Sequence, residues 1–231
     1  MQDIKENLVQ TSRSYVTPPE AVDLLKQHPP LIICGVTASG KNVIQNYIVQ
    51  HANYAHIVTH TTRPMRTKEV NGVDHWFVSE REMLRLLEEQ AMIETQPIHG
   101  GFVYGTSFAA YRKVVESGKR PLIDLNITGI NKLSHTVSSL ESIFILPPSF
   151  DVWMDRLGGR DFMSDGEKAR RLRSARDELE EALTNKNLIL MVNHELDETA
   201  RLIMQGVTKY AYDQEKNYNL AHELIEYLRT Y

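Results

Sequence analysis

A glycine-rich segment, Gly35-Val-Thr-Ala-Ser-Gly-Lys41, limits the folds open to this chain more than any other part of its sequence. It follows a short apolar run at residues 31–34 and precedes a helical stretch over residues 41–50. In this strand, loop and helix order, backbone N–H groups and the helix N-terminus point at one anion, and the lysine reaches the β- and γ-phosphates of a nucleoside triphosphate. A strand-to-helix turn that binds nothing has no need for a lysine at this offset. The predicted ATP-binding residues of this P-loop are Gly35, Thr37, Ala38, Ser39, Gly40, Lys41 and Asn42.

The residue after the lysine departs from the motif. Serine or threonine normally stands there and ligates Mg²⁺ through its hydroxyl, whereas this chain has Asn42. An asparagine carbonyl is also a hard oxygen ligand, but its side chain is longer than a hydroxyl and approaches a metal differently. The sequence therefore supports triphosphate binding better than it supports fast catalysis.

The rest of the chain alternates apolar runs with helical patterns. Apolar runs typical of buried parallel strands recur at residues 121–125, 142–146 and 188–192, and helical patterns occur at residues 79–89 and 108–117. Such alternation predicts an α/β fold, in which helices cover both faces of a parallel sheet. The length of 231 residues suits one domain with small inserted lobes.

The composition indicates the cellular compartment and excludes some classes of binding partner. No apolar run approaches the roughly 18 residues of a membrane helix, and the N-terminus lacks the pattern of a secretory signal. The single cysteine, Cys34, ends a buried strand and is interpreted as a packed thiol, so we expect a reducing, cytoplasmic setting and no membrane partner. A formal net charge of -4 argues against broad nucleic-acid binding. The sequence is compatible with a monomer or a homodimer.

A second candidate anion site lies within residues 59–79. Arg63 and Arg66 are flanked by hydroxyl residues, and an Asn71-Gly72 turn follows between extended segments. Two arginines in this arrangement form a bidentate phosphate clamp beside a small hairpin. Taken alone, the block reads as a solvated basic loop. With a P-loop about twenty residues upstream, a second phosphate site is the better interpretation.

Several further stretches, in order, resemble the guanylate kinase family over about residues 30–209. The stretches that carry the resemblance are residues 61–66, 69–74, 77–79, 104–106, 143–149, 156–160 and 192–193. The resemblance implies a P-loop NTPase-type three-layer α/β fold with a parallel core sheet, a small mixed-β lobe that binds GMP (about 59–107) and a helical lid (about 155–181). Residues 1–29 would then be an N-terminal extension and residues 210–231 a C-terminal helical extension. These extensions could form a dimer interface, a regulatory clamp or only packing.

The same resemblance implies transfer of the γ-phosphoryl group of ATP to GMP or dGMP, giving ADP and GDP or dGDP. In this family pattern Arg63, Arg66 and Tyr104 grip the acceptor phosphate. A carboxylate at Glu94 accepts hydrogen bonds from guanine N1 and its amino group, which adenine cannot supply. The implied GMP-binding residues are Thr59, Arg63, Arg66, His75, Glu94, Tyr104, Thr106 and Asn126.

The residues implied for the chemistry are mostly cationic. Arginine and lysine neutralise the charge of the transferring phosphoryl group, and no general base is required. The implied catalytic residues are Lys41, Arg63, Asp124, Arg160 and Arg171, with Arg156 as a further candidate. The candidate ligands for Mg²⁺, the implied cofactor, are Asn42 and Asp124. Any one arginine of the lid could instead be solvated helix surface, which is the favoured interpretation for Arg170 and Arg173.

Three residues depart from the family pattern where the chemistry is expected: Asn42, His75 in place of a phosphate-binding tyrosine, and Asn126 in place of an aspartate. His75 still has an N–H to donate to a phosphate. Three functions therefore stay open: an active GMP or dGMP kinase, a catalytically degenerate module that binds nucleotide or protein, and a kinase of the same fold for another acceptor such as ribose 1,5-bisphosphate. Retention of the P-loop lysine, the arginine pair and Glu94 favours the first.

Overall fold

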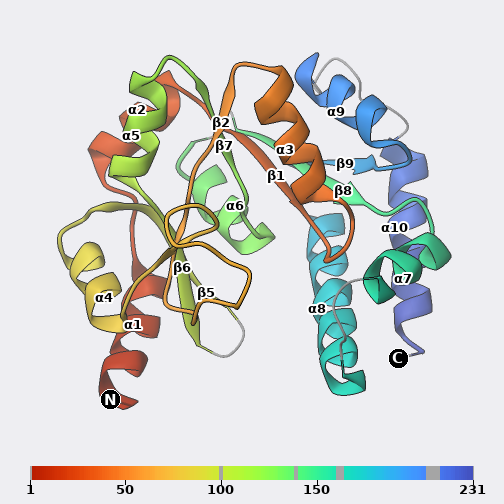
Figure 1. Cartoon of the computed structure of the whole chain (residues 1–231), viewed down its shortest axis with the longest axis horizontal. Helices are drawn as coiled ribbons and strands as arrows, with labels where there is room; N and C mark the ends of the chain where they lie inside the picture. The colour runs from red at the N-terminus through yellow and green to blue at the C-terminus, as the bar shows by residue number, and fades with distance from the viewer. Residues whose placement is uncertain (1, 99–100, 138–139, 160–163, 207–213, 231) are drawn as a thin grey trace. The chain divides into compact units, whose positions relative to one another are not determined.

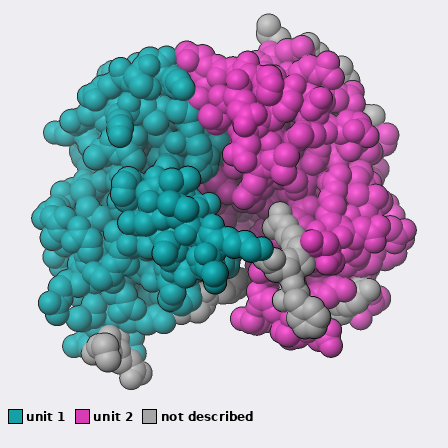
Figure 2. All heavy atoms as spheres, in the orientation of Figure 1, with its two compact units in different colours: residues 1–30, 55–123, 128–140 teal, residues 31–54, 124–127, 141–231 magenta. Residues whose placement is uncertain are grey.

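The computed structural model describes residues 2–98, 101–137, 140–159, 164–206 and 214–230. The chain divides into two compact units, drawn in teal and magenta in Figure 2. Unit 1 comprises residues 1–30, 55–123 and 128–140, and unit 2 comprises residues 31–54, 124–127 and 141–231. Each unit is therefore assembled from segments that lie far apart in the sequence.

The helices and strands are distributed between the units as follows (Figure 1). The elements of unit 1 are α1 (Gln2–Ser14), α2 (Pro19–Gln27), β3 (His60–Thr61), β4 (Trp76–Phe77), α4 (Glu80–Glu88), β5 (Met92–Ile98), β6 (Phe102–Ser107), α5 (Phe108–Glu116) and β7 (Arg120–Ile123). Those of unit 2 are β1 (Leu31–Gly35), α3 (Lys41–His51), β8 (Glu141–Leu146), α7 (Phe150–Gly158), α8 (Asp165–Thr184), β9 (Leu188–Val192), α9 (Leu196–Met204) and α10 (Gln214–Leu228). The first residues of β2 (Tyr54–His56) and α6 (Ile127–Ser134) belong to unit 2 and the others to unit 1. None of the helices in the described ranges has both the length and the apolar character needed to cross a bilayer.

The strands form a five-stranded sheet in the order β2-β7-β1-β8-β9 and a four-stranded sheet in the order β4-β3-β6-β5. Within unit 2, β1, β8 and β9 run parallel, with Ile33 opposite Ile143 and Phe144 opposite Leu190. Residues 31–34 of β1 are all buried, as expected for a strand covered on both faces. Figure 1 shows α3 and α9 on one side of these strands and α8 and α10 on the other. The predicted α/β fold with a parallel core sheet is confirmed.

The outer margin of β9 is covered by side chains of α10. The amide of Gln214 accepts from the backbone N–H of Leu190 at 3.1 Å and donates to its carbonyl oxygen at 3.0 Å. Asn217 donates to the same carbonyl oxygen at 2.7 Å. These amides satisfy backbone groups that a strand at the end of a sheet otherwise leaves unpaired.

Unit 1 contains the mixed four-stranded sheet, in which β6 pairs antiparallel with β3 and β5, and β3 pairs parallel with β4. The first helix of the chain packs on this sheet and on α4. Its Leu8 and the following Tyr15 are buried in one cluster with Met83, Leu87, Met92 and Val103. The N-terminal segment is therefore an integral part of the core of unit 1.

Candidate active site

The glycine-rich loop in unit 2 adopts the conformation that its sequence predicts. Gly40 has a φ of +96°, and a Cβ on it would lie 2.3 Å from the Nδ2 atom of Asn193, so no other residue fits without displacement. The first hydrogen bonds of α3 are donated by the N–H groups of Val43 and Ile44 to the Gly40 carbonyl oxygen, both at 3.1 Å. The N–H groups of Lys41 and Asn42 precede them and can bind an anion. Lys41 begins this helix.

Side chains from two other elements hold the carbonyl groups of this loop. Asn193, directly after β9, donates to the Ser39 carbonyl oxygen at 2.9 Å, and the indole of Trp153 on α7 donates to the Thr37 carbonyl oxygen at 2.7 Å. Arg156 donates to the carbonyl oxygens of Ser39 and Asn193, both at 3.4 Å. Sequence reasoning offered Arg156 as a candidate but missed Trp153, because nothing in a local pattern shows that α7 meets the loop.

The ammonium of Lys41 forms a short ion pair with the carboxylate of Asp124, the first residue after β7. Both side chains are partly exposed, at 24% for Lys41 and 30% for Asp124. The pair brings together two predicted site residues that lie 83 positions apart. Asn42 is exposed beside Lys41, and Asn126 lies in the loop after β7 in the same unit.

Glu178 on α8 is an acidic residue near this pair that the sequence analysis missed. Its carboxylate accepts from the hydroxyl of Ser174 at 3.2 Å. Burial raises the pKa of Glu178 to about 7, while the charge of Lys41 lowers this pKa and that of Asp124 raises it. The signal available in the sequence was helical spacing, since Glu178 lies seven residues, close to two turns, after the predicted Arg171.

The predicted lid arginines have different surroundings. Arg160 lies outside the described residues. Arg171 is partly exposed and its Nε atom donates to Glu167 at 2.9 Å. Arg176, which the sequence analysis did not select, has a buried Nε atom that makes no hydrogen bond within the described part of the chain. Arg170 is exposed and pairs with Glu167, in keeping with its interpretation as helix surface.

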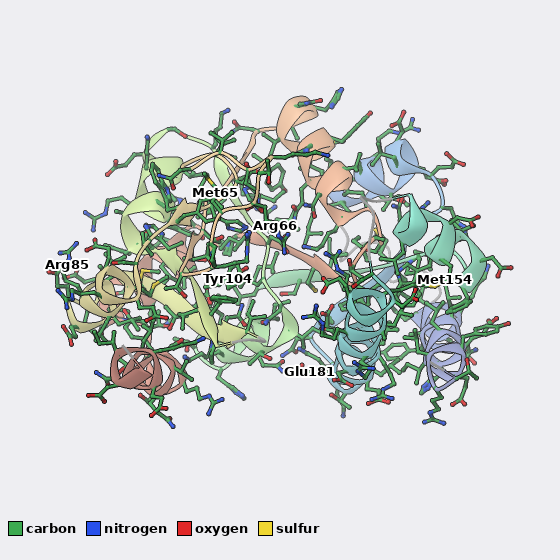
Figure 3. All side chains as sticks on the ribbon, turned by 60° about the horizontal axis from the view of Figure 1, so that its bottom comes forward. Met65, Arg66, Arg85, Tyr104, Met154 and Glu181 are labelled. Carbon is green, nitrogen blue, oxygen red and sulfur yellow. The ribbon has the colours of Figure 1, made fainter. Side chains whose placement is uncertain are left out.

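In unit 1, the structure brings Arg63, Arg66 and Tyr104 together around Glu69. The Nε atom of Arg63 donates to the hydroxyl of Tyr104 at 2.8 Å, and its two terminal nitrogens donate to the Glu69 carboxylate at 2.9 and 2.8 Å. Glu69 also accepts from the backbone N–H of Arg66 at 2.8 Å. Hydrogen bonds from Arg63 are the main cause that lowers the pKa of Glu69 to about 2. Arg66 and Tyr104 are seen in the same part of unit 1 in Figure 3.

Glu69 is a further residue whose role the sequence analysis missed. Its carboxylate holds the guanidinium of Arg63 in a fixed orientation, whereas the side chain of Arg66 is 66% exposed and lies 3.9 Å from the same carboxylate. The exposed guanidinium of Arg66 is thus available to an anion, and the buried guanidinium of Arg63 is already held in one orientation. Glu69 is the first residue of one of the stretches that resemble the family, residues 69–74. No local pattern, however, identified Arg63 as its partner.

His75 joins the same group of side chains. Its Nδ1 atom lies 2.8 Å from the hydroxyl of Thr59, and its ring meets the ring of Tyr104 edge-on with 5.6 Å between centroids. The guanidinium of Arg63 lies over the ring of Phe77 at 5.4 Å. The structure therefore places His75 beside Thr59 and Tyr104, two of the other residues implied for acceptor binding.

Glu94 is a carboxylate buried in the same sheet. It is 1% exposed, and its Oε1 atom accepts from the hydroxyl of Thr106 on the adjacent strand at 2.8 Å. Its Oε2 atom makes no hydrogen bond within the described residues. Burial raises the pKa of Glu94 to about 7, and hydrogen bonds from Thr106 and the charge of Lys132 lower it. Because an unpartnered buried oxygen is costly, this carboxylate suits a ligand that brings N–H donors.

The strand pattern explains why these groups share one face. Tyr104 and Thr106 are two residues apart on β6, so their side chains point to the same side of the sheet. Glu94 on β5 pairs with Thr106 in the antiparallel register. Among the implied acceptor residues, Asn126 is the one that belongs to unit 2.

A glycine-rich strand-to-helix loop ending in a lysine in unit 2, and paired arginines beside a tyrosine in unit 1, are features typical of P-loop kinases. Comparison with known proteins narrows this class. The guanylate kinase family model matches residues 27–210. The chain therefore belongs to the guanylate kinase family.

Individual relatives agree with this assignment. The guanylate kinase of Neisseria gonorrhoeae (strain ATCC 700825 / FA 1090) is 30% identical over 196 residues, covering 84% of this chain and 94% of that protein. The guanylate kinase of Neisseria meningitidis serogroup A is 34% identical over 153 residues, covering 66% and 74%. The crystal structure of guanylate kinase from Anaplasma phagocytophilum superposes with a TM-score of 0.60 at 25% identity, covering 80% of this chain and 87% of that one.

Proposed function

We propose that this protein transfers the γ-phosphoryl group of ATP to GMP or dGMP, producing ADP and GDP or dGDP. The observation that carries the choice of acceptor is the buried Glu94 carboxylate, whose Oε2 atom has no partner within the described residues. Guanine offers an N1–H and a 2-amino group on one edge, and both can donate to one carboxylate. Adenine presents a bare acceptor at N1 and would leave the buried carboxylate without a donor. The site therefore rejects adenine.

On the donor side, Lys41 and the first N–H groups of α3 would hold the β- and γ-phosphates of ATP. The residues present also fit the Mg²⁺ that the family implies, because Asp124 and Asn42 supply hard oxygen atoms next to Lys41. When bound, Mg²⁺ neutralises charge on the donor phosphates. Asp124 also restrains the Lys41 ammonium until the phosphates arrive.

On the acceptor side, Arg66, Tyr104 and His75 would hold the phosphate of GMP, with Arg63 oriented by Glu69. Arg160 and Arg171 would neutralise charge on the transferring group, and no general base is needed. We further propose that residues 59–107 act as the acceptor lobe and residues 155–181 as the lid of a kinase domain that spans residues 30–209.

The two other functions are less well supported. A degenerate binding module has no use for both a triphosphate loop and a preorganised acceptor clamp. A kinase for ribose 1,5-bisphosphate has no use for the Glu94 carboxylate, because that acceptor carries no base. A cytoplasmic location fits the proposal, since Cys34 is a buried free thiol and thiols stay reduced there.

A coupled assay of ADP release with Mg²⁺ and ATP tests the proposal against five acceptors: GMP, dGMP, AMP, UMP and ribose 1,5-bisphosphate. We expect turnover with GMP and dGMP and little with the others. ATP binding without turnover on any acceptor would instead support the degenerate module. Turnover confined to ribose 1,5-bisphosphate would show that Glu94 has been assigned the wrong ligand.

The residue after the P-loop lysine gives a separate prediction. Asn42→Ser restores the hydroxyl that the motif normally provides, so it should lower the Mg²⁺ concentration needed for half-maximal ATP binding. One improved ligand contact of about 1 kcal/mol corresponds to roughly fivefold. Isothermal titration of ATP at several Mg²⁺ concentrations measures the change. Asn46→Ser, at an exposed position on the same helix, is the matched control. An unchanged Mg²⁺ dependence would exclude Asn42 from the metal site.

A further inference from the structure

The first helix of the chain precedes the residues that the family model matches. The family model begins to match at residue 27, whereas α1 covers Gln2–Ser14. Nevertheless Leu8 is fully buried and Tyr15 is 5% exposed in the core of unit 1. Unit 1, which contains the proposed guanine-binding carboxylate, therefore includes a helix that lies outside the residues matched by the family model.

The end of α1 is attached to strand β5 on both sides of Glu94. Before Glu94, the Tyr15 hydroxyl donates to the Met92 carbonyl oxygen at 2.7 Å and accepts from the Met92 N–H at 3.2 Å. After Glu94, the Ser12 hydroxyl donates to the Thr95 hydroxyl at 3.1 Å, which in turn donates to the Ser12 carbonyl oxygen at 3.3 Å. Ser12 and Thr95 are both buried, so these bonds are shielded from water.

Lys132 on α6 connects the same two elements. Its ammonium donates to the Ser12 carbonyl oxygen at 2.9 Å and to the Thr95 carbonyl oxygen at 3.3 Å. The Ser12 carbonyl lies in the last turn of α1, where carbonyl groups lack intrahelical partners and favour a cation. The position of Lys132 is thus set by the end of α1 and by the residue next to Glu94.

We propose that α1 and Lys132 form a support for the acceptor carboxylate, in which the end of α1 holds the Lys132 ammonium where its charge favours the ionised form of Glu94, the form that guanine recognition uses. This inference rests on the proposed function. Lys132 acts as a positioning residue, because its bonds are to backbone carbonyls. The N-terminal segment thereby contributes to base selectivity, in addition to its packing.

The neighbouring groups shift the pKa of Glu94 in the direction that this role requires. The groups that act on the Glu94 carboxyl are Thr106, through hydrogen bonds, and Lys132, through its charge, and both lower a pKa that burial has raised. Glu94 in turn raises the pKa of Lys132, which burial lowers. Removing the Lys132 charge should therefore raise the Glu94 pKa further. A larger share of the carboxyl would then be protonated at neutral pH and would accept one N–H fewer.

The first test compares the pH dependence of kcat/KM for GMP in the parent and in Lys132→Gln. We expect the acidic limb of the profile to move to higher pH by about one unit, and kcat/KM at pH 7 to fall by up to about tenfold. The KM for ATP should stay within about twofold. Arg13→Gln removes an exposed charge from the same last turn of α1 and should change none of these quantities. An unmoved acidic limb in Lys132→Gln overturns the proposal.

A second measurement does not depend on activity. Titration of the Glu94 carboxyl by carbon NMR, assigned with Glu94→Gln, should show a higher midpoint in Lys132→Gln than in the parent. A higher midpoint without any turnover of GMP would refute the proposed function while leaving the support in place. An equal midpoint would refute the support whatever the activity.

The part played by α1 itself is tested with Tyr15→Phe, which keeps the buried ring and removes both bonds to Met92. Glu94 is two residues further along β5, so loosening Met92 should weaken the contact between Glu94 and the base. We expect the KM for GMP to rise about threefold to tenfold, the effect of losing about one hydrogen bond to GMP. The KM for ATP should be unchanged. An unchanged KM for GMP would show that this attachment of α1 does not position Glu94.

Discussion

Replacing Lys41 by methionine should lower kcat for phosphoryl transfer by about 100- to 1000-fold, the loss typical when one charge-stabilising group is removed from an active site. In the P-loop motif the lysine is the group that reaches the β- and γ-phosphates, and we propose this role for Lys41. Without it, the carboxylate of Asp124, now paired with Lys41, would face the phosphates with its charge unopposed. Affinity for ATP should therefore fall together with kcat.

The coupled assay and isothermal titration of ATP measure these two effects. Lys186→Met, at an exposed position in unit 2, is a matched control that should retain the activity of the parent. Retention of more than a tenth of the parent kcat by Lys41→Met would mean that the loop does not hold the reacting phosphates.

Replacing Glu94 by glutamine should remove most of the selectivity for guanine. Two charge-assisted hydrogen bonds of roughly 1.5 to 3 kcal/mol each predict a fall in kcat/KM for GMP of about 100- to 10,000-fold. The amide keeps the shape of the carboxylate but offers one acceptor where the base has two donors. The KM for ATP should hardly change. Glu88→Gln, an exposed acid on α4, is the control. A GMP preference that survives in Glu94→Gln would assign base recognition to other residues.

The same substitution should change the pH dependence of folding. The Glu94 pKa is about 7 in the folded chain against an ordinary value of 4.5, so the group favours the folded state below pH 4.5 and this contribution is lost as pH rises through 7. The parent should lose up to about 3 kcal/mol of unfolding free energy over this window through Glu94. In Glu94→Gln this loss should be absent. Urea unfolding at pH 5 and pH 8 compares the two proteins.

Much of the architecture could be predicted because its signals are local. The predicted strand at residues 188–192 coincides with β9, and that at residues 142–146 lies within β8. The third predicted strand, residues 121–125, extends two residues beyond the end of β7 at Ile123. The reason is chemical, because Asp124 leaves the sheet to pair with Lys41.

Some of the missed residues have partners that are distant in the sequence. Lys132 bonds a carbonyl 120 residues away, and Trp153 bonds one 116 residues away. A local pattern contains no information about such pairs. The N-terminal helix is a different case, since Leu8, Ser12 and Tyr15 follow one another at intervals of four and three. That spacing indicates a helix with one buried face, and it was available in the sequence.

The two amides of α10 that bond Leu190 have a consequence for how this protein behaves when shortened. Together they occupy the N–H and the carbonyl group of Leu190, at the middle of β9, with which a further strand would otherwise pair. A version of the protein ending before Gln214 would expose these two groups at the end of the sheet, where a second copy could pair with them. The last helix thus protects the centre of β9 from self-association.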